Sequence, residues 1–472
     1  MVLLLLITLS VLTSTYDAID LYPPYTITAG PTYTAYKFNI LQHLTALSPY
    51  FETNTNGLSP DPPPGCTVVK AAYLVRHASI YANDYDYEAT LYPFLQRLKN
   101  ASSLENVNFS CASDLAFLTT WTSPITDSKK QVEKLTISGG LEAFHFGTRL
   151  AYRYPHLLPT KKTNASVFKV WASKANRTRQ SANAFFAGLY GGIQEDTIGQ
   201  VILIAEGEEQ GANTLTPHKS CPRFSDSAGA KEADIWLKYY TGSIIARFAA
   251  MGTGFNFSAN DVLAMQELCG YETVIRGSSL FCPIFTSDEW LSFEYYFDIK
   301  YHYQLGYGAD RSPSLGMPWV VASSNLLNEA RTTDQDLYIS FTHRQKPLLV
   351  LTSLGLYNNS CYAGVDDINT TFPLDQINHQ RAWRTSELIP VLGHVALERL
   401  DCASVTHTGS FVRVLVNSIP KPLPHCASGP AGSCPLPHYM DYVQRRHALY
   451  EKFSKTCGVR YKNTTDVLAI YS

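Results

Sequence analysis

The 472-residue chain has no surplus of charge of either sign. Its 38 Lys and Arg residues stand against 40 Asp and Glu residues, which gives a formal net charge of −2. This balance excludes the strongly basic surface that a nucleic-acid or polybasic membrane partner requires, so we expect no nucleic-acid partner. The residues are 45% hydrophobic and 17% charged. Such a chain can bury a large core, which excludes intrinsic disorder.

Hydrophobic runs long enough to cross a bilayer are also lacking. The longest apolar stretch, Val2 to Leu12, is too short for a membrane span but typical of the apolar part of a signal peptide. We therefore predict a signal peptide over residues 1–18, no stable membrane span, and a secreted or luminal protein. A short membrane-proximal anchor is the alternative.

Metal-binding spacings are absent too. The chain has ten cysteines but no C-x-x-C pair and no histidine cluster beside them, which favours disulfides over a metal site. We expect no metal and no cofactor. N-x-S/T sequons, which are typical of a glycoprotein, occur at Asn100, Asn108, Asn164, Asn176, Asn256, Asn358, Asn369 and Asn463.

The hydrophobic pattern predicts alternating strands and helices at both ends of the chain. Residues 19–66 are rich in Pro, Thr and Tyr and predict an irregular N-terminal wrap. Strand patterns cover residues 67–76, 167–173, 337–341 and 412–416, and helical patterns cover 139–154, 181–190, 348–356 and 439–455. We predict an α/β fold with a mainly parallel sheet flanked by helices (67–165 and 300–472) and an inserted, mostly α-helical domain (166–299).

Several predicted strands end in histidine or lead into arginine. Arg76 and His77 follow the first strand, Arg177 follows the second and His343 the third. Ligands of α/β sheets bind at the carboxyl ends of strands. Guanidinium groups bind phosphate oxygens and an imidazole can attack phosphorus, so this combination indicates phosphate chemistry.

Ordered motifs from about residue 40 to the C-terminus resemble the histidine acid phosphatase family, in particular its secreted fungal phytase branch. Arg76 to Ala82 falls on the R-H-G-x-R-x-P signature, and Ala172 to Arg177 matches the A-S-x-x-x-R segment. Further stretches also match: residues 63–66, 281–290, 354–359 and 412–417.

This resemblance implies roles for individual residues. His77 would be the nucleophile that becomes a phosphohistidine, and Arg76, Arg177 and His343 would bind the phosphate. The family's chemistry requires no metal. The resemblance also implies the disulfides Cys66–Cys402, Cys221–Cys457, Cys269–Cys282 and Cys426–Cys434. Cys111 and Cys361 have no counterpart, and would either pair with each other or stay free.

The chain departs from the family pattern at the centre of the site. Ile80 replaces the second signature arginine, Ala78 the glycine and Ala82 the proline. Arg344 replaces the aspartate that protonates the leaving alcohol, and a guanidinium cannot act as a general acid. Loss of the general acid would cost roughly 10²- to 10⁴-fold in rate. Loss of the charged oxyanion ligand would cost roughly 10²- to 10³-fold. A glycan on Asn176 would also crowd a phosphate pocket.

These departures predict a reused pocket: a non-hydrolytic enzyme of fungal specialised metabolism, such as a cycloaddition or dehydration catalyst for an apolar or aromatic small molecule. The alternatives are a weak secreted acid phosphatase or phytase, and a non-catalytic binding protein that keeps the residues as inherited scaffold. The candidate catalytic residues are His77, His343 and Arg344, and the candidate substrate-binding residues are Arg76, Ile80, Tyr81 and Arg177. Three other histidines, predicted on helices, are expected to have structural or surface roles: His145, His394 and His447.

Overall fold

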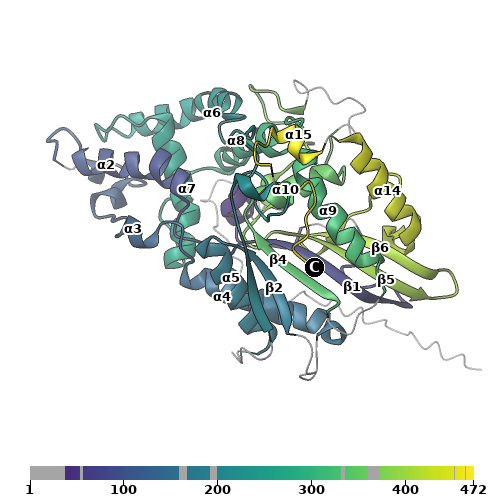
Figure 1. The fold of residues 1–472 in the computed structure, drawn as a ribbon. Coiled ribbons are helices and arrows are strands. Elements are labelled where there is room, and N and C mark those ends of the chain that lie inside the picture. Colours follow the sequence, from purple (N-terminus) through teal and green to yellow (C-terminus); the bar gives the residue numbers. More distant parts are fainter. Residues whose placement is uncertain are drawn as a thin grey trace, which may run out of the picture. The chain divides into compact units, whose positions relative to one another are not determined.

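A mixed sheet of eight strands organises the fold, which we describe from a computed structural model (Figure 1). The structure describes residues 38–53, 57–101, 103–158, 167–191, 199–330, 335–359, 371–450, 452–462 and 464–471. The strands run in the order β3-β2-β4-β1-β5-β6-β7, with β8 beside β6. Their bounds are β1 (Cys66–Arg76), β2 (Phe168–Ser173), β3 (Gly199–Ile204), β4 (Leu337–Thr342), β5 (His394–Ala403), β6 (Thr408–Val416), β7 (Ile419–Pro420) and β8 (Cys434–Pro435).

The sheet is parallel in one half only. β3, β2, β4 and β1 are parallel, whereas β5, β6, β7 and β8 continue the sheet in antiparallel pairs. The prediction of a mainly parallel sheet is therefore correct for the half that carries the candidate site and wrong for the other. His394 begins β5 and does not lie on a helix, which corrects its predicted position.

Helices cover both faces of the sheet. α4 (Ile137–Arg153) and α5 (Asn176–Leu189) pack on one face, where Phe146 and Phe185 meet alternate residues of β1 such as Tyr73 and Val75. The other face is covered by α9 (Ser312–Asn328), α10 (Gln345–Ser353) and α14 (Leu436–Leu449) (Figure 1). Burial of both faces explains why the inner parallel strands β1, β2 and β4 are mainly apolar.

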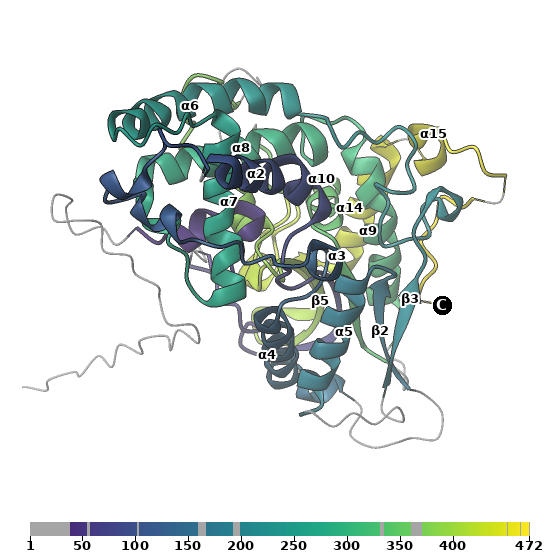
Figure 2. The same ribbon diagram turned by 90° about the vertical axis from the view of Figure 1, so that its left-hand side faces the viewer.

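A helical part lies beside the sheet (Figure 2). Its members are α1 (Asp84–Asp86), α2 (Tyr92–Ala101), α3 (Ser128–Gln131), α6 (Ala230–Ala250), α7 (Ala259–Arg276) and α8 (Ser287–Leu305). α7 and α8 each begin with a capping box, Ser258 with Asp261 and Thr286 with Glu289, which fixes where they start. The short helices α13 (Thr385–Leu388) and α15 (Phe453–Cys457) complete the set of described α-helices.

The predicted boundary of the inserted domain at residue 166 needs correction. β2 and β3 lie between residues 166 and 204 and belong to the main sheet, because they pair in parallel with each other and with β4. α1, α2 and α3 come from the segment before β2, so the helical part draws on two stretches of chain. All described residues from Ile40 onward belong to one compact unit.

Four disulfides link the described residues. They join Cys66 to Cys402, Cys221 to Cys457, Cys269 to Cys282 and Cys426 to Cys434, the pairs that the family resemblance implies. Cys111 is exposed and free, and Cys361 lies outside the described residues. Within the described part of the chain, no helix combines the length and hydrophobicity of a membrane span.

The N-terminal predictions fall mostly outside the described residues. The predicted signal peptide and the first part of the wrap precede residue 38. The described remainder of the wrap contains two short 3-10 helices, Ile40–His43 and Thr45–Leu47. Among the sequon asparagines, Asn100, Asn108, Asn176 and Asn256 are exposed and Asn358 is half-buried, while Asn164, Asn369 and Asn463 lie outside the described residues.

Candidate active site

Three neighbouring parallel strands bring the predicted site residues together. β1 ends at Arg76, directly opposite Thr342 at the end of β4, and β2 pairs with the other edge of β4. His77 continues this register, because its backbone N–H donates to the Thr342 carbonyl at 2.9 Å. The His77 and His343 rings consequently lie 5.7 Å apart between centroids, almost perpendicular to each other.

His77 is held in one orientation and kept neutral. Its Nδ1 lies 2.9 Å from the Ala78 carbonyl oxygen, which can only accept, so the neutral ring carries its proton on Nδ1. Burial, followed by the charges of Arg177 and Arg76, holds the pKa of His77 well below its usual range. This tautomer leaves the lone pair on Nε2, as a nucleophile requires.

Arg177 and His343 bind each other. Arg177, in the first turn of α5, donates from Nε to Nδ1 of His343 at 3.2 Å. The Nε2–H of His343 therefore faces Ser173 Oγ at 3.3 Å and Glu206 Oε1 at 3.4 Å. Burial and the charge of Arg177 lower the pKa of His343 to about 3. The two predicted phosphate-binding groups are thus joined by a direct hydrogen bond.

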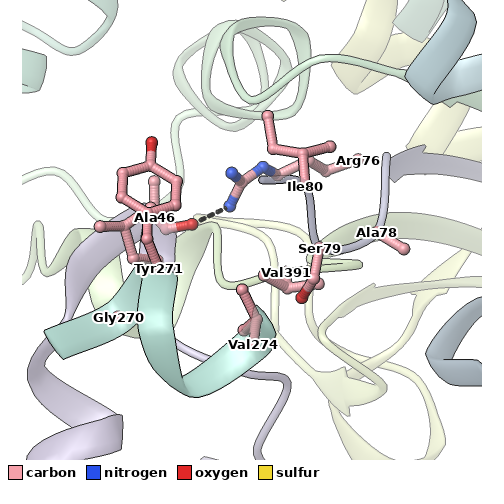
Figure 3. A pocket seen from close by; sticks show the side chains of 10 residues that line it. Ala46, Arg76, Ala78, Ser79, Ile80, Gly270, Tyr271, Val274 and Val391 are labelled. Carbon is pink, nitrogen blue, oxygen red and sulfur yellow. Dashed lines mark hydrogen bonds between the residues drawn. The ribbon is translucent and has the colours of Figure 1, made fainter. Parts of the chain in front are cut away.

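Arg76 is tied to the backbone on one side and faces a small pocket on the other (Figure 3). Its Nη1 donates to the carbonyls of Ala46 and, at 2.9 Å, Ile389. Its Nε is buried without a hydrogen-bond partner among the described residues. The pocket is walled mainly by apolar groups: Ala46, Leu47, Ala78, Ile80, Val274 and Val391, with Tyr271 across from Ile80.

Arg344, which directly follows His343, is surrounded by aromatic rings and carboxylates. Its guanidinium carbon lies 5.4 Å from the centroid of the Tyr301 ring, and its Nη1 lies 4.0 Å from Asp86 Oδ2. Burial opposes the charge, but Tyr301, Asp86 and Tyr271 outweigh it and raise the pKa of Arg344. Burial and then Arg344 lower the pKa values of both Arg76 and Arg177 to about 10. Three guanidinium groups therefore share one electrostatic environment.

Sequence reasoning missed the carboxylates of the site. Glu133 forms an ion pair with Arg177, and Glu206 contacts both His343 and Lys219. Burial opposes the ionisation of Glu206, but hydrogen bonds from His343 and Lys219 outweigh it and lower its pKa. The buried His218 ring also lies 6.2 Å from that of His343. None of these residues falls in a recognisable motif, and Glu206 follows β3, a strand that the pattern did not reveal.

In the part of the chain that the structure describes, no hydrogen bond or ring contact joins His77 to two residues that the sequence associates with the site, Tyr81 and Asn176. Tyr81 is half-buried, and no hydrogen bond or ring contact among the described residues joins its side chain to His77. Asn176 is exposed, and its amide oxygen accepts from Arg179 at 3.1 Å. Within the described residues, no group of three or more His, Cys, Asp or Glu side chains is arranged to hold a metal.

Comparison with known proteins shows the family to which this chain belongs. Residues 31–417 match the histidine phosphatase superfamily, branch 2, and the chain belongs to that family. An acid phosphatase of Komagataella pastoris is 32% identical over 441 residues, covering 91% of this chain and 88% of its relative. A thiamine-repressible acid phosphatase of Schizosaccharomyces pombe is 30% identical and covers 91% and 93%, respectively.

Solved structures agree on the fold. The crystal structure of the phytase from D. castellii matches with a TM-score of 0.81 at 24% identity, covering 95% of this chain and 93% of that one. This likeness confirms the predicted α/β architecture of the histidine acid phosphatase type.

Proposed function

We propose that this protein is an acid phosphatase that transfers a phosphoryl group from a phosphomonoester to Nε2 of His77. The observation that carries this proposal is the neutral His77, with Nδ1 bound to the Ala78 carbonyl and Nε2 left for attack. In the first step the bond between Nε2 and phosphorus forms and the P–O ester bond breaks, so the leaving group departs as an oxyanion that takes its proton from solvent. Water then attacks phosphorus, the N–P bond breaks, and inorganic phosphate leaves with the His77 imidazole restored.

The charges around His77 support phosphate binding. Arg76, Arg177 and Arg344 lie close enough to affect one another's pKa values, and a bound phosphate dianion would relieve their repulsion. Arg344 can stabilise negative charge on the leaving oxygen, but it has no proton to give. The favoured substrates are therefore esters of acidic alcohols, such as aryl phosphates, whose leaving groups depart without protonation.

The pocket beside Arg76 supports an apolar organic group on the substrate. Ile80 and Val391 provide a wall where a second signature arginine would bind phosphate oxygens. An apolar side chain cannot compensate the charge of a second phosphate, so we expect a preference for singly phosphorylated esters over inositol hexakisphosphate.

The same substitutions favour a second candidate, a non-hydrolytic enzyme of fungal specialised metabolism acting on an apolar or aromatic molecule. Ile80 and Arg344 remove the two groups on which efficient hydrolysis depends, while the remaining arginines and histidines could polarise a carbonyl oxygen. For either activity we propose a secreted or luminal location, because the four disulfides suit an oxidising compartment.

Hydrolysis assays separate the two candidates. At acidic pH, the wild type should release phosphate from an aryl phosphate faster than from inositol hexakisphosphate, and acid-labile phosphohistidine should accumulate. His77→Ala should abolish both signals. His145→Ala, which changes an exposed histidine on α4, is the matched control and should retain them.

If the wild type shows no hydrolysis, a variant that restores the family residues tests whether these substitutions are the cause. Ile80→Arg combined with Arg344→Asp restores the family residues, and Glu267→Gln removes a buried carboxyl that interacts with Arg344. If the wild type releases no phosphate from any ester but this triple variant does, the phosphatase proposal is wrong and the second candidate is preferred.

A further inference from the structure

Glu133 reaches the site through an uncommon backbone conformation. Its φ is 67°, a left-handed value that few residues other than glycine adopt. Backbone hydrogen bonds hold it there: Glu133 N–H donates to the Ala82 carbonyl at 2.8 Å, and Tyr81 N–H donates to the Lys134 carbonyl at 3.0 Å. These backbone hydrogen bonds therefore hold the segment before α4 alongside the segment that follows His77.

The carboxylate of Glu133 has a partner on each oxygen. Oε2 pairs with Nη1 of Arg177, and Oε1 accepts from the backbone N–H of Asp84 at 3.2 Å. The Arg177 side chain is 14% exposed and that of Glu133 28%, so the ion pair lies at the open side of the site. Nε of Arg177 already donates to His343, and Glu133 occupies a second nitrogen of the guanidinium, Nη1.

We propose that Glu133 is an internal anion that occupies Arg177 in the empty site and thereby sets the substrate specificity. A carboxylate and a phosphoryl group bind a guanidinium through the same kind of charge-assisted hydrogen bonds, so the two compete for Arg177. An incoming phosphomonoester must displace Glu133. The displaced carboxylate then remains at the entrance, beside the exposed Asp84, and repels additional phosphate groups.

This inference rests on the proposed function, since it assumes that the site receives a phosphoryl group. It predicts that the wild type binds inorganic phosphate more weakly than a form without the Glu133 carboxylate does. The difference should be larger for inositol hexakisphosphate. Glu133 is a positioning residue in this scheme, because it acts through Arg177 and not on the reacting atoms.

Calorimetric titration of the full-length protein tests the inference without turnover. Glu133→Asn removes the charge and shortens the side chain, and asparagine tolerates a left-handed backbone. We expect this variant to bind inorganic phosphate roughly tenfold more tightly, the scale of one charge-assisted hydrogen bond, with a larger gain for inositol hexakisphosphate. Glu133→Gln, which keeps the length of the side chain, should show the same direction if the asparagine variant does not fold.

Glu88→Gln is the matched control, because it removes one negative charge from an exposed position in the same segment as Asp84 and should leave both affinities unchanged. Equal phosphate affinities in the wild type and both Glu133 variants would overturn the inference. If His77 forms no phosphohistidine but the Glu133 variants still bind phosphate more tightly, the proposed function is wrong and the inference about Glu133 stands. In an active wild type, the Glu133 variants should lower KM for an aryl phosphate and leave kcat within about twofold.

Discussion

His77 has the two properties that the proposed function requires of a nucleophile that works in acid. Its ring is oriented through Nδ1, and burial together with Arg177 and Arg76 disfavours its protonation. An ordinary histidine, with a pKa near 6.5, would be mostly protonated at pH 5 and unable to attack phosphorus. In the proposed function, the arginines that would bind phosphate therefore also keep Nε2 of His77 available for attack.

This electrostatic role predicts the titration of His77. Its imidazole should remain neutral as the pH falls through 6.5 and should gain a proton only well below that value. NMR of histidine-labelled protein would report this as a resonance, missing from His77→Ala, that does not move between pH 7 and pH 5. A midpoint near 6.5 for that resonance would contradict the prediction.

At the same scale, the sequence was sufficient to predict His77, Arg177 and His343 as neighbours, because each follows a strand and matches a family motif. It did not predict Glu133, Glu206 or Asp86. These carboxylates reach the site from a loop in a left-handed conformation, from the end of an unpredicted strand and from a helix of three residues. Such positions depend on tertiary contacts and have no periodic signature.

At the scale of elements, the close crossing of α4 and α5 positions Arg177. A Cβ atom added at Gly188 of α5 would lie 1.9 Å from the Phe144 carbonyl oxygen of α4, and one added at Gly147 of α4 would lie 2.1 Å from the Phe185 carbonyl oxygen. The two helices can approach this closely only with glycine at these points. Because Arg177 lies in the first turn of α5, this contact also fixes the guanidinium relative to His343.

Gly188→Ala should therefore destabilise the protein by about 1–3 kcal/mol, the usual cost of overpacking, and should reduce activity by shifting Arg177. Chemical denaturation measures the first effect. Gly140→Ala, also on α4, is the control, because no atom lies within 4 Å of its added Cβ, and alanine there should be neutral or stabilising by up to about 1 kcal/mol. Equal stabilities of the two variants would show that the crossing is not tight.

Strand prediction succeeded for β1, β2 and β4 and failed for β3 and β5, for physical reasons. The first three are apolar runs buried on both faces of the sheet. β3 lies at the sheet edge with several partly exposed residues, and β5 carries buried charge, including Glu398, which Arg413 and Arg153 neutralise. A buried ion pair interrupts the hydrophobic pattern on which the prediction depends.

At the scale of the whole molecule, the Cys66–Cys402 disulfide closes the largest loop among the described bridges. It joins residues 336 positions apart, at the point where β1 and β5 pair directly. The disulfide restricts the unfolded chain, and the entropy that it removes grows with the length of the closed loop.

Replacing both cysteines by alanine should cost about 2–5 kcal/mol of unfolding free energy, measured by denaturant titration. The active-site geometry should be retained, since the bridge lies at the start of β1 and His77 follows its end. Cys111→Ser, which alters an exposed free thiol, should change stability by less than about 0.5 kcal/mol. If Cys111→Ser lowered the free energy of unfolding as much as the double variant does, the stabilisation would not be specific to the Cys66–Cys402 disulfide.

The packing of Arg344 has a consequence for how this protein can evolve. Asp86 and Glu267 both stabilise the guanidinium, and the pKa of Glu267 is already raised well above its usual range by burial and by Asp86. A single substitution of Arg344 by aspartate would bring a third carboxyl group to this buried cluster and remove its positive charge. The first step on a mutational path from Arg344 to aspartate therefore leads through a less stable protein. The order of substitutions matters, and neutralising Glu267 or Asp86 has to precede the introduction of the aspartate.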